Sequence, residues 1–335
     1  MAGVSCIVVA YRHEPAELSA LIAALGNDVS EVLVVDNAGD PALERALAGT
    51  GSARILRPGG NLGYAPACDL AAREATGEWL LFLNPDAMPE PGLVPALLEA
   101  ADDDVAILGA QVLLPDGERV NAGDNPLHVT GLSWAGRYGE PAEDGPPRDV
   151  AVCSGAALLV RARDFHELGG YHPDSFMYYD DVDLAWRARL AGRRVRFVPR
   201  ARVRHDYDFD KGAYKWFWLE RNRLWSVLSN YEGRTLALLA PLLLATEAGI
   251  LVLAVRDGWW REKLRAWGAL WREKRQLWMW RREVQARRCV RDGNLLSAFS
   301  TAIDTPLVPL PAASLVNRVV GWWAAFAERL AGRDR

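Results

Sequence analysis

The chain has 335 residues, of which 50% are hydrophobic and 24% charged, and its formal net charge is −4. This length suggests two domains, and the ordinary composition excludes a disordered chain, a collagen and a polytopic membrane protein. The slight excess of acid also argues against binding through bulk positive charge, so we expect no nucleic-acid partner. The charge is uneven, because residues 256–291 hold twelve Lys or Arg and only four Asp or Glu.

Short apolar runs alternate with helical periodicity over the first two hundred residues. The apolar runs lie at 4–10, 31–36, 79–83 and 105–114, and the helical patterns at 15–26, 41–49, 64–76 and 91–101. Continuous apolar strands separated by helices predict an α/β fold with a mainly parallel sheet and helices on both faces. Ligands bind such sheets beyond the carboxyl ends of the strands. The glycine-rich turn at 58–63 matches neither G-x-G-x-x-G nor a P-loop, which disfavours a dinucleotide fold.

Two acids and one histidine are candidate ligands at those strand ends. Asp36 and Asp86 each follow an apolar run, where Asp is often only a turn residue. The functional alternatives are an acceptor for a ligand N–H at Asp36 and a divalent-cation ligand at Asp86. A lone His such as His205 is more often a surface or satisfied residue, and it qualifies as a metal ligand only if it returns to the edge that holds Asp86.

Three acids, Asp180, Asp181 and Asp183, lie at the start of a helix predicted to run to about Ala191. Acids in a first turn suit N-capping and the helix dipole, which is their structural explanation. Capping needs only one side chain, however, and crowded acids behind two tyrosines have raised basicity that suits a general base. Asp181 is therefore the candidate base.

Seven segments follow one another along the chain: VVAYR, VLVVDNAGD, NLGYAPACDLAAREATGEWLLFLNPDAMPEPG, CSGAALLVRARDF, FMYYDDVDLAWRARLAG, VPRARVRH and LERNRLWSVLSN. This ordered set resembles the inverting glycosyltransferases of family 2, which have the GT-A fold, and within them the rhamnosyltransferase-like branch of bacterial polysaccharide enzymes. The resemblance covers about residues 4–230. It implies a GT-A catalytic domain over residues 1–230. For residues 231–335 we expect a helical, basic and Trp-rich membrane-associated region, on the charge and tryptophan spacing described below.

The resemblance also implies a role for each matching residue. The implied contacts with the nucleotide sugar are Tyr11, Arg12, Asp36, Asn61, Gly63, Asn84, Asp86, Gly155 and Ala156. Asp181 matches the catalytic base, and Asp180 and Tyr179 lie on the acceptor side. Asp86 and His205 match ligands of a divalent cation, Mg or Mn.

Several positions depart from the family pattern, which leaves the donor open. Arg12 replaces the usual Asn, Asn84 replaces the first acid of the Asp-x-Asp motif, and Asp180 replaces the Glu of a Glu-Asp pair. Pro66, Cys68 and Asp69 replace a stretch of small residues and Asn. None of these changes removes the implied base.

The resemblance implies transfer of a sugar, best assigned as L-rhamnose, from a dTDP- or UDP-linked donor to a hydroxyl of a glycan or lipid-linked acceptor in cell-envelope polysaccharide synthesis. The reaction would be a single inverting displacement with an Asp base and a divalent metal. One alternative is a non-catalytic membrane-surface scaffold with a degenerate transferase domain. Another is a sugar nucleotidyltransferase, although AYRHEP after the first strand lacks that class's glycine-rich phosphate loop.

The apolar segment 236–255 is long enough to cross a membrane. Glu247 in its middle would cost about 2.5–3.5 kcal/mol in the bilayer if it behaves like Asp, and one crossing would export the basic segment 256–291. We therefore expect a re-entrant, in-plane or protein-buried helix pair. The N-terminus shows no signal-peptide pattern and the four cysteines no C-x-x-C spacing, which favours the cytoplasm.

Five apolar residues beyond this segment follow helical spacing: Trp260, Leu264, Trp267, Trp271 and Trp278. Arg and Lys occupy much of the rest of that helix, a pattern typical of a helix on an anionic membrane surface. We therefore expect peripheral association with the inner face of the plasma membrane. The alternative is packing against the catalytic domain or a homo-oligomer partner.

Overall fold

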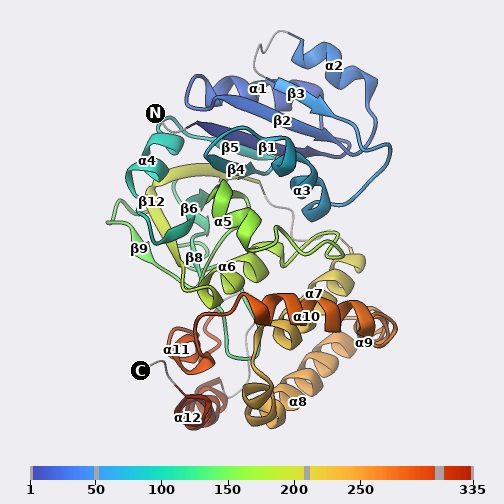
Figure 1. The fold of residues 1–335 in the computed structure, drawn as a ribbon, viewed down its shortest axis with the longest axis vertical. Helices are drawn as coiled ribbons and strands as arrows, with labels where there is room; N and C mark the ends of the chain where they lie inside the picture. Colours follow the sequence, from blue (N-terminus) through green and yellow to red (C-terminus); the bar gives the residue numbers. More distant parts are fainter. Residues whose placement is uncertain (1–2, 49–52, 207–211, 306–312, 333–335) are drawn as a thin grey trace. The chain divides into compact units, whose positions relative to one another are not determined.

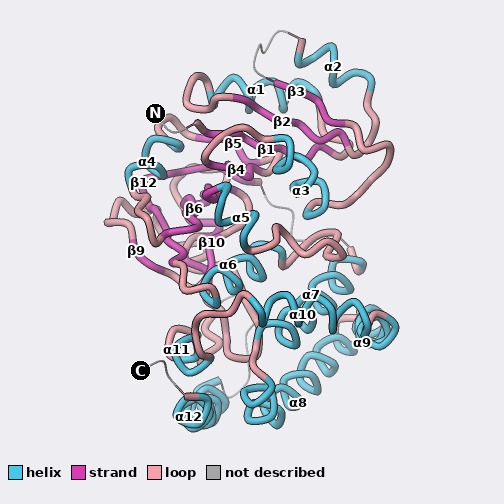
Figure 2. Tube along the Cα trace, viewed as in Figure 1, coloured by secondary structure: helices cyan, strands magenta, loops and turns pink. Residues whose placement is uncertain are grey.

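A computed structural model describes residues 3–48, 53–206, 212–305 and 313–332 (Figure 1). The chain divides into two compact units. Unit 1 comprises Met1–Asn125, Ala135–Ala185 and Arg194–Asp208, and unit 2 comprises Pro126–Trp134, Trp186–Arg193 and Phe209–Arg335. The named strands all lie in unit 1, whereas the described part of unit 2 is built from helices and loops (Figure 2). Residue 230 as the limit of the catalytic domain stays a prediction.

The elements follow the predicted alternation through the first hundred residues. The strands are β1 (Val4–Ala10), β2 (Glu31–Asp36), β3 (Ala53–Leu56), β4 (Trp79–Leu83), β5 (Ala87–Pro89), β6 (Val105–Leu113), β7 (Val120–Ala122), β8 (Asp124–Asn125), β9 (Arg148–Asp149), β10 (Val152–Cys153), β11 (Ala157–Arg161) and β12 (Arg194–His205). The helices that cover them are α1 (Pro15–Leu25), α2 (Pro41–Leu47), α3 (Ala65–Glu74), α4 (Leu93–Glu99), α5 (Ala162–Glu167) and α6 (Asp180–Leu190).

The main sheet is mixed, with the order β3-β2-β1-β4-β11-β6-β12-β5. β3, β2, β1 and β4 run parallel to one another, and β6 runs parallel to β12. β11 is antiparallel to both of its neighbours, so it begins beside the point where β4 ends. The predicted α/β class is confirmed, and this arrangement gathers several loops at the carboxyl edge of the parallel strands.

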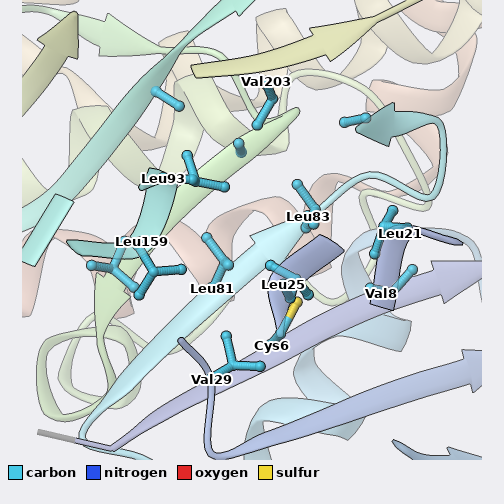
Figure 3. Packing of buried hydrophobic residues seen from close by; sticks show 14 of the residues in the cluster. Cys6, Val8, Leu21, Leu25, Val29, Leu81, Leu83, Leu93, Leu159 and Val203 are labelled. Carbon is cyan, nitrogen blue, oxygen red and sulfur yellow. The ribbon is translucent and has the colours of Figure 1, made fainter. Parts of the chain in front are cut away.

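Both faces of the sheet are buried, which explains why its strands are continuously apolar. One core packs alternate strand residues such as Val8 and Leu81 against Leu21 of α1 and Leu93 of α4 (Figure 3). On strand residues of the other parity, Phe82 meets the aromatic rings of Phe165 and Tyr171 at centroid distances of 5.0 and 5.2 Å. Because successive side chains point to opposite faces of the sheet, each strand contributes residues to two separate apolar layers.

Unit 2 contains α7 (Tyr214–Asn230), α8 (Gly233–Arg256), α9 (Trp260–Arg272), α10 (Lys274–Ala286), α11 (Asp292–Leu296) and α12 (Ala313–Ala331). α8 contains Pro241 and, among the described residues, is the one helix whose length and hydropathy would suffice to cross a bilayer. Tyr231, in the link between α7 and α8, is fully buried and donates its hydroxyl to the Val129 carbonyl at 2.9 Å. The short segment 126–134 is thereby joined to the helices of unit 2.

Candidate functional site

The parallel register brings the first candidate residues to one edge of the sheet. Ala10 at the end of β1 pairs with Asp36 at the end of β2, and β4 runs parallel to β1 on its other side. Tyr11 and Asn84 therefore follow strands that end at the same edge as Asp36. Tyr11 is 40% exposed, and the guanidinium carbon of Arg12 lies 5.1 Å from the centre of its ring.

One carboxylate oxygen of Asp36 accepts hydrogen bonds from the backbone, and the other has no hydrogen-bond partner. Its Oδ1 accepts the backbone N–H groups of Ala38, Gly39 and Asp40 at 3.2, 2.7 and 3.1 Å. Its Oδ2 is buried without a hydrogen-bond partner and lies 3.5 Å from Nε of Arg57. Because a buried unpaired acceptor is costly, this oxygen is suited to a ligand N–H. The sequence did not single out Arg57, whose only signal is its place shortly before the glycine-rich turn.

The turn that contains Asn61 and Gly63 is tied to the same edge. Gly63 donates its N–H to Oδ1 of Asn61 at 2.9 Å, and its carbonyl accepts from Nδ2 of Asn37 at 2.8 Å. Gly63 has φ of 86°, and a Cβ there would overlap the Phe176 carbonyl. Only glycine fits this position. Asn37, which follows Asp36 directly, is a positioning residue that the sequence reading left unassigned.

His205 lies beside Asp86, which is the condition stated above for His205 to be a candidate metal ligand. Nε2 of His205 lies 2.9 Å from Oδ1 of Asp86. β12 runs antiparallel to β5, and the register pairs His205 with Ala87. His205 is buried, its carbonyl accepts from Nδ2 of Asn121 at 3.0 Å, and the Asp86 side chain is 32% exposed.

The donor atoms of this pair fit a divalent cation only in part. A carboxylate oxygen beside an imidazole nitrogen suits Mn²⁺ better than Mg²⁺, which prefers oxygen alone. Within residues 3–48, 53–206, 212–305 and 313–332, no group of three or more His, Cys, Asp or Glu is placed to hold an ion. Oxygens from a bound ligand would have to complete the coordination sphere.

Asp181 contacts the backbone at Gly155, beside the residue that is hydrogen-bonded to Asn84 just after β4. The Asn84 N–H donates to the Ala156 carbonyl at 2.9 Å, and the next residue back, Gly155, donates its N–H to Oδ2 of Asp181 at 2.7 Å. The Val182 N–H donates to the other oxygen at 2.8 Å. A Cβ on Gly155 would lie 3.2 Å from the Asp181 side chain, so glycine permits this approach.

Asp180, the first residue of α6, is buried, its neighbour Asp181 is half-buried, and each affects the pKa of the other. Burial and, to a smaller extent, the charge of Asp181 together raise the pKa of Asp180 to about 8. Burial also raises the pKa of Asp181, while the N–H groups of Gly155 and Val182 act in the opposite direction. The two acids therefore titrate as a pair, and the two N–H groups at Asp181 favour its ionised form, which can accept a proton.

The candidates assigned to the acceptor side are buried rather than open. Tyr179 and Asp180 are each 8% exposed. Phe176, Tyr178 and Tyr179 have φ of 51°, 66° and 67°, a left-handed conformation that non-glycine residues rarely adopt. Asp69, one of the departures from the family pattern, accepts the Tyr171 N–H at 2.9 Å and so ties α3 to the segment before this strained turn.

Comparison with known proteins gives matches to glycosyltransferases. The profile described as "Glycosyl transferase family 2" matches residues 5–169. The chain is 30% identical over 229 residues to N-acetylglucosaminyl-diphospho-decaprenol L-rhamnosyltransferase of Mycobacterium tuberculosis, covering 59% of this chain and 75% of that protein. It is 36% identical over 72 residues to rhamnosyltransferase WbbL of Escherichia coli, covering 20% and 27%.

A solved structure shares the fold. The crystal structure of GalNAc-T7 with UDP, GalNAc and Mn²⁺ superposes with a TM-score of 0.58 at 15% identity, covering 69% of this chain and 48% of that one. The GT-A fold expected from the sequence is thereby confirmed. With the M. tuberculosis relative matched over three-quarters of its length, the chain belongs to glycosyltransferase family 2 and is a glycosyltransferase.

Proposed function

We propose that this glycosyltransferase moves a sugar from a nucleoside diphosphate to an acceptor hydroxyl, with inversion at the anomeric carbon and Asp181 as the base. The observation that carries the proposal is the position of Asp181. It is half-buried, oriented by the Gly155 N–H, and joined through residues 155–156 to the strand end that leads to Asp86. A carboxylate so held can take the acceptor's proton as the hydroxyl attacks.

The catalytic step needs only one displacement. The acceptor oxygen forms a bond to the anomeric carbon while the bond to the diphosphate oxygen breaks, and the acceptor's proton goes to Asp181. The transition state carries positive charge near the sugar ring, which an ionised Asp181 stabilises. Asp180 supports this role as a protonated neighbour, because a second ionised acid there would raise the pKa of the base further.

Asp86 and His205 would hold a divalent cation, Mg or Mn, which neutralises charge on the departing nucleoside diphosphate when it is bound. The mixed oxygen and nitrogen ligands favour Mn²⁺. Exposure of Asp86 leaves it accessible to a diphosphate, whereas the buried His205 is fixed by β12.

The nucleotide base of the donor would lie at Asp36, beside Tyr11 and Arg12. One oxygen of Asp36 accepts three backbone N–H groups, which leaves Oδ2, 3.5 Å from Nε of Arg57, as the acceptor for an N–H of the nucleotide base. The imide edge of uracil or thymine offers an N–H between two carbonyls and matches an acceptor beside a donor. Guanine offers two adjacent donors and matches less well. This supports a UDP- or dTDP-linked donor.

The similarity to an L-rhamnosyltransferase and to WbbL supports L-rhamnose as the sugar and a glycan or lipid-linked acceptor in cell-envelope synthesis. A lipid-linked acceptor would be presented at the inner face of the plasma membrane. The exposed Trp271 and Trp278, on a helix pair rich in arginine, support peripheral association of unit 2 with that surface.

The proposal is tested by calorimetric titration of UDP, dTDP, GDP and CDP with and without Mn²⁺, on the wild type and on Asp86→Ala. We expect Mn²⁺-dependent binding of UDP or dTDP that the variant loses. Transfer assays with the matching donors on wild type and Asp181→Asn then test the base. Absence of nucleotide binding across the panel would instead favour a non-catalytic scaffold.

A further inference from the structure

The exposed face of α8 contains no polar side chain between Arg234 and Arg256. The exposed residues of that interval are Ala237, Pro241, Leu244, Ala245, Ala248, Gly249, Val252 and Val255. Their spacing keeps them on one side of the helix. Leu244 and Val252 are 70% and 68% exposed, so this side packs against nothing in the described part of the chain.

The one acid of α8 points the other way, into unit 2. Glu247 forms ion pairs with Arg223 of α7 and, at 2.7 Å, with Lys263 of α9, and it accepts from the indole N–H of Trp267 at 2.6 Å. Burial pushes the pKa of Glu247 up, but the charges of Arg223 and Lys263 outweigh it and hold that pKa below its usual value. Glu220 pairs with the same two cations. α8 thus has charge inside and apolar surface outside, the reverse of a helix in water.

A second helix of unit 2, α12, has an exposed apolar stripe of its own. α12 exposes Val316, Val319, Trp322, Phe326 and Leu330, which recur at steps of three or four and so form a stripe on one face. Trp322 is 83% exposed. α12 is joined to α8, because the indole N–H of Trp323 donates to the Leu238 carbonyl at 2.8 Å.

The charges of the adjoining helices indicate what covers this surface. The exposed basic residues of α9 and α10 are Arg261, Arg265, Arg272, Lys274, Arg275 and Arg282. A second copy of the chain would bring two such sets of positive charge toward each other, which disfavours a dimer through these helices. Anionic lipid headgroups attract the same charges, and tryptophan prefers the headgroup region.

We propose that α8 and α12 lie in the plane of the membrane interface, with their outer stripes among the lipid acyl chains. The inference rests on the proposed membrane-linked function and specifies how unit 2 binds: in-plane, with both ends of α8 on one side of the bilayer. If α8 crossed the membrane, the ion cluster of Glu220, Arg223, Glu247 and Lys263 would lie beside its middle, within the hydrocarbon. Burying four charges there is far costlier than immersing one apolar face.

The first experiment measures sedimentation of the full chain with vesicles of phosphatidylglycerol and phosphatidylcholine in equal parts, and with phosphatidylcholine alone. Leu244→Glu/Val252→Glu should weaken binding to the anionic vesicles roughly tenfold or more, since two charges enter the stripe. Ala20→Glu/Ala24→Glu is the matched control, because both alanines are exposed on α1. Equal binding of both variants would overturn the proposal.

The second experiment separates an in-plane helix from a spanning one. Arg234→Cys and Arg256→Cys are made in a Cys289→Ser background, since the other three cysteines are buried. In intact spheroplasts, a membrane-impermeant maleimide should label neither position, and after lysis it should label both. Labelling of one position in intact cells would show that α8 spans the membrane and would refute the in-plane arrangement.

Two further outcomes keep this inference distinct from the catalytic proposal. If Leu244→Glu/Val252→Glu converts a wild-type dimer to a monomer and vesicle binding is absent, the stripe is an interface between copies and the inference is wrong. Nucleotide binding by the same variant, measured calorimetrically, should equal that of the wild type. Loss of membrane binding with normal nucleotide binding supports the inference, whereas a wild type that binds no nucleotide contradicts only the proposed function.

Discussion

Nε2 of His205 lies 2.9 Å from Oδ1 of Asp86, although 119 residues separate the two in sequence. The contact follows from one antiparallel pairing, which sets the last residue of β12 opposite Ala87 at the start of β5. Asp86 precedes that paired residue, so its carboxylate meets the imidazole. The strand register therefore brings together the two residues that we propose as metal ligands.

Replacing either member of the pair should weaken metal-dependent nucleotide binding. For Asp86→Ala we expect a loss in Mn²⁺-dependent affinity of roughly tenfold or more, because the only acidic ligand of the pair is removed. His205→Gln should lose less than His205→Ala, since the amide keeps a donor atom. Titration calorimetry checks both, with Glu17→Gln on the exposed face of α1 as the control. Unchanged Mn²⁺ dependence in Asp86→Ala would contradict the metal assignment.

Asp181→Asn should lower kcat by about 10²–10⁴-fold, the range for losing a general base. The amide cannot take a proton, yet it keeps the size of the side chain and can still accept from the Gly155 N–H. Donor affinity should therefore change little. The measurement is a transfer rate at saturating donor beside calorimetric donor binding. If donor binding disappears together with activity, Asp181 has a different role.

Asp36→Asn should change which base is bound. Because three backbone N–H groups fix the oxygen at the Oδ1 position, the new amide would direct its NH₂ group toward the site. A donor now stands where the acceptor was, so UDP should lose affinity relative to CDP by about tenfold or more. Competition binding of the two nucleotides measures this ratio. Asp40→Asn, which alters a cap of α2, is the control and should leave the ratio unchanged.

The raised pKa of Asp180 predicts how stability depends on pH. Since its pKa in the folded state is about 8, above the unfolded value near 3.9, the folded state holds the extra proton between these limits. Its contribution to the free energy of unfolding is complete below the unfolded pKa and falls as pH rises toward 8, by up to about 1.4 kcal/mol per pH unit. Asp180→Asn removes this dependence.

The Tm of Asp180→Asn minus that of the wild type should accordingly increase between pH 5 and pH 8, roughly the window given by the raised pKa. Thermal unfolding followed by circular dichroism measures the difference. Asp103→Asn, an exposed acid, provides the comparison and should show a constant difference. A flat profile for Asp180→Asn would mean that Asp180 is ionised in the folded protein at neutral pH.

Glu247→Gln should destabilise unit 2 by about 3–5 kcal/mol, because Arg223 and Lys263 would remain buried with one fewer counter-charge. Glu283→Gln removes an exposed pair with Arg287 and should cost no more than about 1 kcal/mol. Urea unfolding monitored by tryptophan fluorescence compares the two variants. Similar midpoints would show that the Glu247 pair contributes little to stability.

The alternation of apolar strands and helices was readable from the sequence because burial on both faces leaves a continuous apolar run in each strand. Apolar continuity also located Asp36 and Asp86, since a polar residue that ends such a run must lie at the sheet edge. The ordered motifs supplied the family. Local chemistry alone sufficed for these features.

Other features depended on contacts between distant segments. No local pattern reveals that Oδ2 of Asp36 faces Arg57, that Asn37 ties down Gly63, or that Gly155 leaves room for Asp181. In unit 2 the sequence showed a long apolar helix interrupted by Glu247, but not which way that acid points. The tertiary structure decided this, because ion pairs with α7 and α9 outweigh the cost of burying the charge and turn the apolar side of α8 outward.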